Sequence, residues 1–499
     1  MRARRRGLLP LLLALAVIGG PVGAQPAADP AADPALGATL SPPARVGRVA
    51  ALRGAVALRQ GDAPGGWQAA RRNDPLTSAS ALITGHGAEV KLEIGPSRLW
   101  LGENARLAII RLDDRRVIGR LDAGALFLDL RDPDPGDAWY VLTRRATLLA
   151  TRTGRFVIEA GGGGGAGERA TRISALDAPA EIMSGARRLR LGVERSAVFI
   201  GAESPYRGAI GDLQVDDFTL VMGAHDPAEY ASSPPVFGLP PQVARMTGGE
   251  NLLAAGTWRN SATLGPLWFP PESSGYTPYS TGIWTYVPPW GWTWVDSTSW
   301  GFAPFHYGRW VPVEGSWAWA PTLANAPLNA EPVYAPALVA FVGQNAGVGM
   351  GSGFGLALGM PSLYPFGGLA WTPLWPGEFY LPPYPTSRAY RRAINRLATA
   401  DPDHPAPPDP ARLAARAESG SAALIGAGAR PDATEGVRGG AEVVDEIHVD
   451  ADRVMTRIRP GFARAMAARS AIATRSGFTA RATAMTPLPA ARPHASSHH

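Results

Sequence analysis

The chain has 499 residues, a formal net charge of +6 and no cysteine. The lack of cysteine excludes disulfides, thiolate catalysis and cysteine-ligated metal, so stability has to come from the burial of apolar surface. The length allows two modest domains. Lys91 is the only lysine, so nearly all positive charge is arginine, which stays protonated and suits bidentate contacts with carboxylate or phosphate.

The first 24 residues have the pattern of a secretory signal peptide. A basic start precedes an apolar run from Leu8 to Gly20, and a small-x-small site ends at Ala24. The apolar run is short for a bilayer span and contains Pro10. We therefore expect residues 1–24 to be removed after export, with general secretion and the twin-arginine route both open.

Residues 25–45 are rich in alanine, proline and aspartate and predict a disordered linker. From 46 to 200, apolar residues alternate with polar ones in short runs that end at glycine, proline, asparagine or aspartate. This period predicts a β-sandwich or roll in which each sheet has one solvent-exposed face. The alternating positions include Val56, Leu58, Val90, Leu92, Ile94, Leu99, Leu101, Leu107, Ile109, Leu126, Leu128, Leu130, Phe156 and Ile158.

Residues 201–247 are a predicted connector, and residues 248–387 form a tryptophan-rich block. Twelve of the fifteen tryptophans of the chain lie in this block. Trp258, Trp284 and Trp310 are 26 residues apart, and another tryptophan follows each of them nine or ten residues later. A fixed period of this length is typical of one supersecondary unit copied along the chain, here an aromatic β-hairpin repeat.

The segments between the tryptophans repeat at the same period. Gly275-Tyr276-Thr277-Pro278-Tyr279 aligns with Gly301-Phe302-Ala303-Pro304-Phe305. The fold class predicted for the whole chain is therefore mainly β. Residues 388–499 are expected to be a mostly disordered tail rich in arginine, alanine and proline, with short helices near 388–398 and 462–473.

No residue pattern in the chain predicts catalysis, a cofactor or a metal site. The eight histidines lack metal-ligand spacing, and His306 fits a packed or surface histidine. The adjacent acids Asp113-Asp114 and Asp216-Asp217 would point to opposite faces of a strand. The acids of the tryptophan-rich block nearest the repeats, Glu272, Asp296 and Glu314, do not predict a facing pair. We expect a non-enzymatic protein.

The aromatic residues allow three interpretations. Exposed tryptophan and tyrosine rings stack on sugars, and Arg309 could orient a carboxylate. Buried rings would instead form the core through cross-strand pairs, which is the favoured interpretation. The third is a protein-binding face. The candidate binding face consists of Trp284, Trp290, Trp292, Trp294, Trp300, Tyr307, Arg309, Trp310, Trp317 and Trp319.

The last 47 residues, from Arg453 to the end, contain eight arginines and no acid. The favoured interpretation is a solvated tail, which could also touch anionic envelope polymers. Because the chain is expected to be exported, we do not expect nucleic acid as a partner.

Residues 46–200 resemble the FecR-type periplasmic domain. The resemblance rests on Gly47-Arg48-Val49, Asn73-Asp74-Pro75-Leu76, Ala88-Glu89-Val90-Lys91-Leu92, Leu99-Trp100-Leu101-Gly102 and Leu121-Asp122-Ala123-Gly124-Ala125-Leu126. The tryptophan-rich block resembles a domain of unknown function that follows FecR-type domains in exported proteobacterial proteins. The matching residues are Trp290-Gly291-Trp292-Thr293-Trp294-Val295, the run from Trp300 to Trp310 and the run from Tyr334 to Gly343.

FecR proteins relay siderophore signals through the inner membrane to a sigma factor. This chain is expected to have neither the cytoplasmic domain nor the transmembrane helix for that task, so the resemblance implies a periplasmic β-rich interaction module. We expect an exported binding or scaffolding protein in the periplasm or envelope of a Gram-negative bacterium. Its partner would be an envelope protein. The alternatives are recognition of cell-wall glycan by the aromatic strip and, third, an uncharacterised envelope hydrolase.

Overall fold

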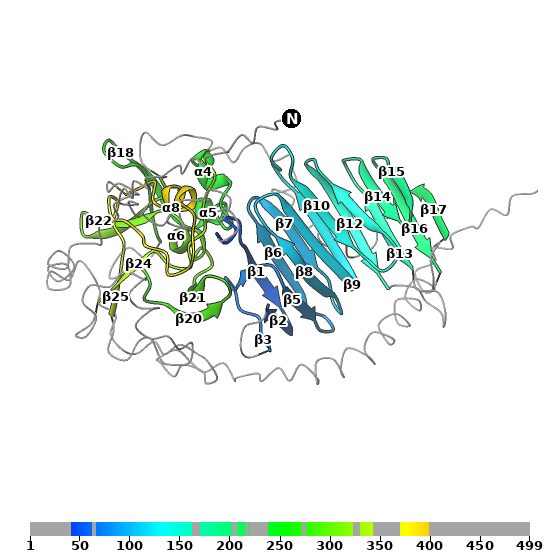
Figure 1. The fold of residues 1–499 in the computed structure, drawn as a ribbon, viewed down its shortest axis with the longest axis horizontal. Coiled ribbons are helices and arrows are strands. Elements are labelled where there is room, and N and C mark those ends of the chain that lie inside the picture. Colours follow the sequence, from blue (N-terminus) through cyan, green and yellow to red (C-terminus); the bar gives the residue numbers. More distant parts are fainter. Residues whose placement is uncertain are drawn as a thin grey trace, which may run out of the picture.

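The computed structural model describes residues 41–61, 66–161, 170–201, 207–214, 218, 238–271, 276–322, 330–342 and 370–398. The described residues form two domains that lie side by side along the long axis of the molecule (Figure 1). We call residues 46–212 the sandwich domain and residues 238–398 the aromatic domain. Among the described residues, no helix has the length and apolar character needed to cross a membrane.

The sandwich domain is one continuous set of seventeen strands folded into two layers (Figure 1). In spatial order, the first layer consists of β4 (Pro75–Leu76), β1 (Gly47–Arg53), β6 (Glu89–Ile94), β7 (Ser97–Leu101), part of β9 (Arg116–Leu130), β12 (Gly154–Ala160), β13 (Thr171–Ala175), β16 (Arg195–Ile200) and β17 (Arg207–Asp212). The second layer consists of β3 (Trp67–Ala69), β2 (Val56–Gln60), β5 (Ser80–Thr84), β8 (Arg106–Leu112), the rest of β9, β10 (Ala138–Leu142), β11 (Thr147–Ala150), β14 (Ala180–Ser184) and β15 (Arg187–Leu191).

Strand β9 belongs to both layers and joins them. Its first half pairs with β8 and, in parallel, with β10, whereas its second half pairs with β7 and β12. The change of layer occurs at Gly124, which has a φ of 85°. A Cβ atom there would lie 2.5 Å from the Cα atom of Ala105, so only glycine fits this position.

The apolar residues of the predicted alternation are buried between the two layers in a single core, so the prediction of a mainly β fold is confirmed. The outer face of the first layer differs from the expectation of a solvent-exposed surface. Trp100, Phe127 and Val157 form a small cluster there, against which Phe218 packs. At the other end of the same layer, the aromatic domain covers Glu93 and Arg98.

The 26-residue repeat of the aromatic domain is a set of three β-hairpins. They are β18 (Thr257–Ser261) with β19 (Gly265–Phe269), β20 (Gly282–Val287) with β21 (Gly291–Asp296), and β22 (Arg309–Val313) with β23 (Ser316–Ala320). The first and third hairpins join through β19 and β23 into a four-stranded sheet, and the second remains separate. The domain is completed by β24 (Val339–Val342), β25 (Ala370–Pro373) and the short helices α4 (Pro241–Ala244), α5 (Asn251–Ala255), α6 (Ala303–His306) and α8 (Arg388–Ile394).

The aromatic domain extends beyond residues 248–387 on both sides. Val243 of the predicted connector and Tyr390 and Ile394 of the predicted tail all belong to its core. Within the predicted linker, Ser41 and Ala44 accept hydrogen bonds from the amides of Ser387 and Tyr334 of this domain. Several predictions concern residues outside the described ranges: the signal peptide, residues 25–40 of the linker, Asp216-Asp217, Glu272 and the tail beyond 398.

Candidate functional site

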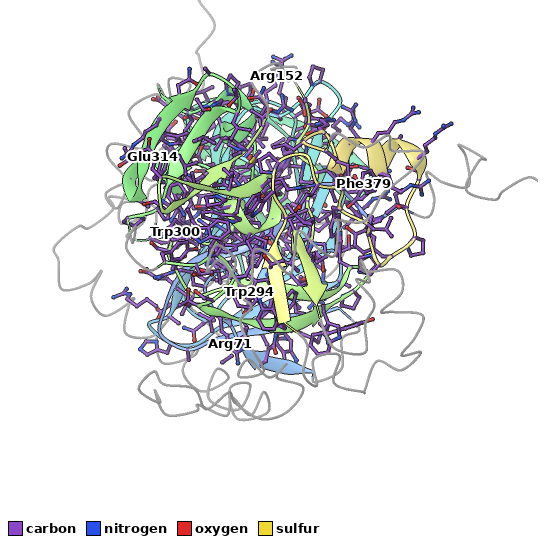
Figure 2. The ribbon with its side chains drawn as sticks, turned by 90° about the vertical axis from the view of Figure 1, so that its left-hand side faces the viewer. Arg71, Arg152, Trp294, Trp300, Glu314 and Phe379 are labelled. Atoms are coloured by element: carbon purple, nitrogen blue, oxygen red, sulfur yellow. The ribbon has the colours of Figure 1, made fainter. Side chains whose placement is uncertain are left out.

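The candidate binding face predicted from the sequence lies in the interior of the aromatic domain. Nine of its ten residues are buried, and Trp292 is half-buried. Figure 2, which looks onto this domain, shows Trp294 and Trp300 among the crowded side chains, whereas Glu314 lies at the rim, in the exposed turn between β22 and β23. Buried rings offer no surface to a ligand, so these positions fit the core interpretation.

Each hairpin of the repeat places two tryptophans directly opposite each other. The cross-strand pairs are Trp258 with Trp268, Trp284 with Trp294, and Trp310 with Trp319. The rings of Trp284 and Trp294, for example, meet edge to face at 5.5 Å. Cross-strand aromatic pairs of this kind each contribute roughly 0.2–1 kcal/mol beyond the area that they bury.

A glycine two residues before the first tryptophan makes room for the second. A Cβ atom on Gly256 would lie 2.5 Å from the ring of Trp268, and the corresponding distance from Gly282 to Trp294 is 2.6 Å. Gly308 has the same relation to Trp319, at 2.5 Å. The repeat unit is therefore Gly-x-Trp followed by the second tryptophan, because the second indole packs against the bare glycine backbone.

The aligned segments between the hairpins contact each other directly. The rings of Tyr279 and Phe305, which are 26 residues apart, meet edge to face at 4.8 Å. The hydroxyl of Tyr279 donates a hydrogen bond of 2.8 Å to the Phe305 carbonyl and accepts one of 3.0 Å from the amide of Leu338. Burial raises the pKa of Tyr279 above its ordinary range, so its hydroxyl stays protonated.

Arg309 is buried and is held by main-chain and amide oxygens. It donates to the carbonyl of Gly308 at 2.8 Å, to the carbonyl of Glu378 at 3.4 Å and to the side-chain oxygen of Asn395 at 3.2 Å. Burial lowers its pKa to about 10, so it remains charged at neutral pH. The guanidinium thus connects the third hairpin to the C-terminal segment of the domain, and its contacts are structural.

His306 packs between Phe302 and Tyr334, whose rings lie 4.4 and 4.6 Å away from its own. Its Nδ1 atom lies 2.8 Å from the carbonyl oxygen of Ala335, which identifies Nδ1 as the donor. Burial lowers the pKa of His306 to about 3. This is a neutral core histidine, as the sequence suggested.

Asp296 is the buried acid at the end of the second hairpin. Its Oδ1 atom accepts hydrogen bonds from the amide and the hydroxyl of Thr298, at 2.9 and 2.6 Å. Its Oδ2 atom lies 3.3 Å from the indole nitrogen of Trp294. These contacts fix the turn that follows β21, and the main chain of this turn then contacts the sandwich domain.

The two domains meet around a buried arginine. Arg48 of β1 is fully buried and pairs with Glu93 of β6 at 2.8 Å. The same guanidinium donates to the side-chain oxygen of Asn73 at 2.7 Å, and the amide nitrogen of Asn73 then donates to the carbonyls of Asp296 and Thr298. Burial by itself would raise the pKa of Glu93, but the neighbouring cations Arg48, Lys91 and Arg98 lower it below its ordinary value.

A second group of contacts joins the same faces of the two domains. Glu250, beside α5, pairs with Arg98 of β7 and lies 3.5 Å from Arg131. The hydroxyl of Thr247 accepts from the amide of Gly95 at 2.8 Å and donates to the carbonyl of Val46 at 2.6 Å. Charges that are buried and paired in this way hold two surfaces in one relative position.

The segment before β1 connects the domains as well. The carbonyl of Ala44 accepts a hydrogen bond from the amide of Tyr334 at 3.0 Å, and the amide of Ala44 donates to Asp114 at 2.7 Å. The side chain of Val46 belongs to the aromatic core. Residues 44–46 therefore lie between the two domains and contact both.

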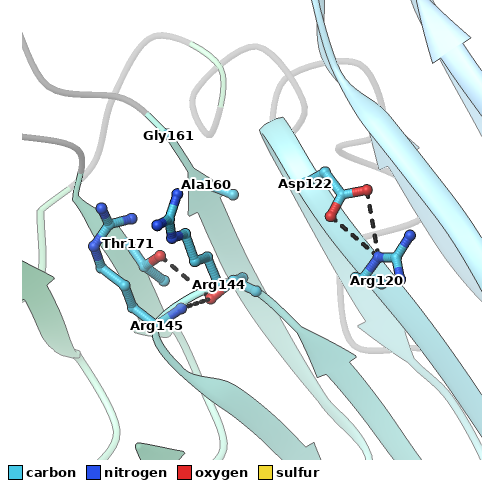
Figure 3. A pocket seen from close by; sticks show the side chains of 8 residues that line it. Arg120, Asp122, Arg144, Arg145, Ala160, Gly161 and Thr171 are labelled. Carbon is cyan, nitrogen blue, oxygen red and sulfur yellow. Dashed lines mark hydrogen bonds and ion pairs between the residues drawn. The ribbon is translucent and has the colours of Figure 1, made fainter. Parts of the chain in front are cut away.

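A hollow of about 390 Å³ opens on the sandwich domain where β9 leaves the second layer. It is lined by Arg120, Asp122, Thr143, Arg144, Arg145, Ala160, Gly161 and Thr171 (Figure 3). Arg120 pairs with Asp122 at 3.1 Å, and the buried Arg145 donates to the carbonyl of Gly201 at 2.8 Å. Its basic lining would suit a small anion.

Among the described residues, Tyr286 is the aromatic residue that stands out as exposed, with 37% of its surface accessible. It lies opposite the half-buried Trp292 on the second hairpin, and their rings meet edge to face at 6.0 Å. Within the same described part of the chain, no group of histidine and acidic residues is arranged to hold a metal ion.

The interface residues Arg48, Asn73 and Glu93 were not predicted from the sequence as a functional group. Arg48 and Asn73 stood in the motifs that carry the family resemblance, and Glu93 was expected on a solvent-exposed face. No local signal marks these residues, because a polar side chain on a strand or in a turn has the same sequence pattern whether it faces water or a second domain. Gly256 was also missed, although it lies at the 26-residue period of Gly282 and Gly308.

The fold and these contacts define a mainly β protein in which two domains form a continuous interface. Residues 249–378 match the model of a family of unknown function, DUF6600. This agrees with the expected nature of the tryptophan-rich block, while the FecR-type resemblance of residues 46–200 stays a prediction. A comparison with curated proteins found no match.

Two crystal structures of "a putative anti-sigma factor from Parabacteroides distasonis ATCC 8503" are distant structural matches. Each is 14% identical in sequence and has a TM-score of 0.24. The match to the structure at 1.65 Å covers 28% of this chain and 64% of that chain, so it spans less than two thirds of that protein. The match to the structure at 2.50 Å covers 34% and 74%. A likeness at this level does not define a shared function.

Proposed function

We propose that this protein is a non-enzymatic binding or scaffolding module of the bacterial cell envelope, exported through its first 24 residues. The observation that carries the proposal is the interface around Arg48, Asn73 and Glu93, which holds two β domains in one position. A rigid, elongated body presents widely separated surfaces in a fixed geometry, which is what a scaffold needs. The polar residues considered for chemistry, Asp296, His306 and Arg309, are engaged in contacts that build this body.

The location can be tested because the chain has no cysteine. An Ile110→Cys variant carries a single thiol at a position that is 45% exposed, and Leu252→Cys carries one at a fully buried position. A maleimide that cannot cross the inner membrane should label the first variant in cells with a permeabilised outer membrane, and should leave the second unlabelled. Labelling of Ile110→Cys only after the inner membrane is broken would contradict an envelope location.

Binding is tested with the mature protein and purified envelope material. We expect saturable association with at least one of isolated sacculi, outer-membrane vesicles or detergent-extracted envelope proteins. Sacculi incubated with the protein should release no soluble fragments above the level of a boiled sample. Release of muropeptides in proportion to the amount of folded protein would overturn the non-enzymatic assignment in favour of a hydrolase.

A second candidate, recognition of cell-wall glycan, is favoured by the exposed ring of Tyr286 beside Trp292. An aromatic pair at a surface can stack on a sugar ring, whereas the buried rings of the domain cannot. A Tyr286→Ala variant would then lose about tenfold or more in affinity for sacculi, which corresponds to about 1.4 kcal/mol. Equal retention of this variant and the unaltered protein would remove the glycan hypothesis for this surface.

A further inference from the structure

The outer face of the second layer has a regular pattern of apolar and basic residues. Cross-strand neighbours form one row from β8 to β15, which reads Arg111, Ile118, Tyr140, Leu149, Glu181 and Arg190. The next row reads Arg120, Leu142, Thr147, Met183 and Arg188. Residues directly opposite each other share a face of the sheet, and these positions alternate with core residues such as Leu148 and Ile182. Both rows therefore point away from the core.

The centre of the two rows is mainly aliphatic and lies at the surface. Ile118, Tyr140, Leu142, Leu149 and Met183 are half-buried, and none of them belongs to a hydrophobic cluster of the described residues. The outer face of the first layer differs, because Phe218 and the aromatic domain cover parts of it. The second layer thus has an apolar strip across β9, β10, β11 and β14 that no described element covers.

Arginines lie on both sides of this strip. The strands of the second layer, with β9 up to Ala123, contain eight arginines and two acids, whereas those of the first layer contain eight basic residues and five acids. Three of the arginines pair with acids at the surface: Arg111 with Asp113, Arg120 with Asp122 and Arg188 with Glu181. Exposed pairs of this kind are weak, and the arginines outnumber the acids, so the face keeps an excess of positive charge.

This combination fits a phospholipid surface with anionic headgroups better than a glycan or a soluble polyanion. Sugars stack on aromatic rings, but Tyr140 is the only aromatic residue of the two rows. A soluble polyanion would gain nothing from the aliphatic side chains. At a bilayer, arginine side chains reach the phosphates while their methylene groups and the neighbouring apolar residues lie at the headgroup level.

The size of the face also suits a bilayer surface. The strands of the sandwich keep nearly one direction across the view of Figure 1, so the layer is broad. From β8 to β15 the rows extend about 24 Å at the usual strand spacing. The hollow described above adjoins the second row at Arg120, which lines it together with Arg144 (Figure 3).

We propose that the outer face of the second layer binds an anionic phospholipid bilayer, with the apolar strip at the headgroup level and the flanking arginines on lipid phosphates. The inference rests on the envelope role proposed above and names a surface that would hold the scaffold in place. Each arginine near an anionic bilayer contributes about fivefold to the affinity, so several of them together give stable binding at moderate salt.

Site-specific labels on the mature full-length chain test which face meets the lipid. The chain has no cysteine, so Thr147→Cys in the second row and Val198→Cys on the outer face of the first layer each carry one label, both at half-buried positions. A nitrobenzoxadiazole label at 147 should shift to shorter wavelength with vesicles of phosphatidylglycerol and phosphatidylcholine, and brominated lipids should quench it. The label at 198 should not respond. Vesicles of phosphatidylcholine alone should change neither label, and added salt should reverse the response.

Charge variants measure the contribution of the arginines. Replacing Arg116 and Arg190 by glutamine removes one exposed arginine beside the first row and one within it, and should weaken vesicle binding about 25-fold. Arg53→Gln with Arg207→Gln removes the same charge from exposed positions of the first layer and should weaken it less than about threefold. The basic residues that follow Arg453 are present in both, so they contribute equally. Equal losses in the two double variants would overturn the proposal.

The remaining outcomes separate this inference from the proposed function. Labels at 147 and 198 that respond equally, or that both fail to respond, would overturn the assignment of this face. A response of the label at 147 to soluble polyglutamate equal to that with vesicles would identify an anionic polymer and overturn the lipid assignment. Saturable binding to sacculi without any response to vesicles would remove this inference and leave the envelope role intact.

Discussion

The side-chain amide of Asn73 donates a hydrogen bond of 2.8 Å to the main-chain oxygen of Asp296, across the boundary between the two domains. Asn73 has a φ of 68°, a left-handed conformation that asparagine tolerates better than most residues. Its oxygen accepts from Arg48, so one side chain joins the arginine of the sandwich domain to the turn after the second aromatic hairpin. The left-handed backbone at Asn73 therefore positions the side-chain amide that connects the two domains.

Replacing Asn73 by glycine should uncouple the domains while preserving the left-handed backbone. The variant loses the bonds to Asp296 and Thr298 and removes one of the acceptors of the buried Arg48, which keeps its pair with Glu93. We expect the free energy of unfolding to fall by about 2–3 kcal/mol. Urea unfolding followed by tryptophan fluorescence and by far-ultraviolet circular dichroism should change from coincident to separate transitions.

The control for this variant is Asn251→Ala. The side chain of Asn251 makes an exposed contact of 3.4 Å with the carbonyl of Ser299 inside the aromatic domain, and the same carbonyl accepts from Arg48 of the sandwich domain. Its loss should change the free energy of unfolding by less than about 0.5 kcal/mol. If Asn73→Gly behaves like Asn251→Ala, the buried network does not couple the domains.

A methyl group at Gly282 should destabilise the second hairpin. In Gly282→Ala the new Cβ atom would lie 2.5 Å from the carbonyl oxygen of Val295 and 2.6 Å from the ring of Trp294. We expect a loss of about 2–3 kcal/mol, because neither the strand nor the buried ring can move freely. Thermal unfolding followed by near-ultraviolet circular dichroism reports on the packing of these tryptophans.

Gly211→Ala on β17 provides the comparison, because no atom lies within 4 Å of the added Cβ and the backbone there is not left-handed. That variant should be unchanged or more stable by about 0.4–1 kcal/mol, since alanine restricts the unfolded chain. A loss of stability in Gly211→Ala equal to that in Gly282→Ala would show that the close approach to Trp294 is not the cause.

Replacing a tryptophan of the repeat should lower the free energy of unfolding, because these side chains form the core. Trp294 is fully buried, so Trp294→Ala should cost about 3–5 kcal/mol. Tyr286, on the same hairpin, is 37% exposed, and Tyr286→Ala should cost about 1 kcal/mol or less. A Trp294→Ala protein that retains its unfolding midpoint would contradict the core assignment of the repeat.

His306 should make the protein less stable in mild acid. Its pKa is lowered to about 3 by burial, from an ordinary value of 6.5, so below pH 6.5 the unfolded chain binds a proton that the folded chain excludes. The stability present above pH 6.5 is then lost as the pH falls toward 3, at up to about 1.4 kcal/mol per pH unit. His306→Asn, which keeps a donor near the Ala335 carbonyl, should lack this part of the pH dependence.

The effect of His306 is measured as the difference between the unaltered protein and His306→Asn, because other groups titrate in the same pH range. Burial raises the pKa of Asp74 to about 6. The contribution of Asp74 to the free energy of unfolding therefore falls as the pH rises from about 4 to 6, which is opposite to the effect of His306. Both proteins share Asp74. Urea midpoints measured from pH 3.5 to 8 should diverge in slope below pH 6.5, and identical slopes would exclude His306 as the sensitive group.

Much of the fold follows from local patterns. Period-two alternation between Val56 and Ile158 predicted the strands of the sandwich, because each layer buries one face. The spacing of Trp258, Trp284 and Trp310 predicted three hairpins, because a copied unit repeats its strand register. Neither pattern depends on how the strands and hairpins pack against other parts of the protein.

The candidate site could not be predicted in the same way, because it depends on contacts between parts of the chain that are distant in sequence. A tryptophan on a hairpin face can stack on a sugar or pack into a core, and what covers it determines which of the two occurs. Here Tyr334, Trp371 and Tyr390, which come after the repeat, pack with the repeat tryptophans in one core. In the same way, Glu93 lies on the polar side of its strand, and it is buried because the aromatic domain lies against it.

The sequence by itself determined the β class, the hairpin period and the positions of its paired tryptophans, since these arise from the alternation and spacing of neighbouring side chains. Only the tertiary structure decided that the tryptophans form a core and that Arg48, Asn73 and Glu93 form an interface. The physical reason is that burial is a property of two surfaces together. A residue can carry the same local pattern whether its other side faces water or another domain.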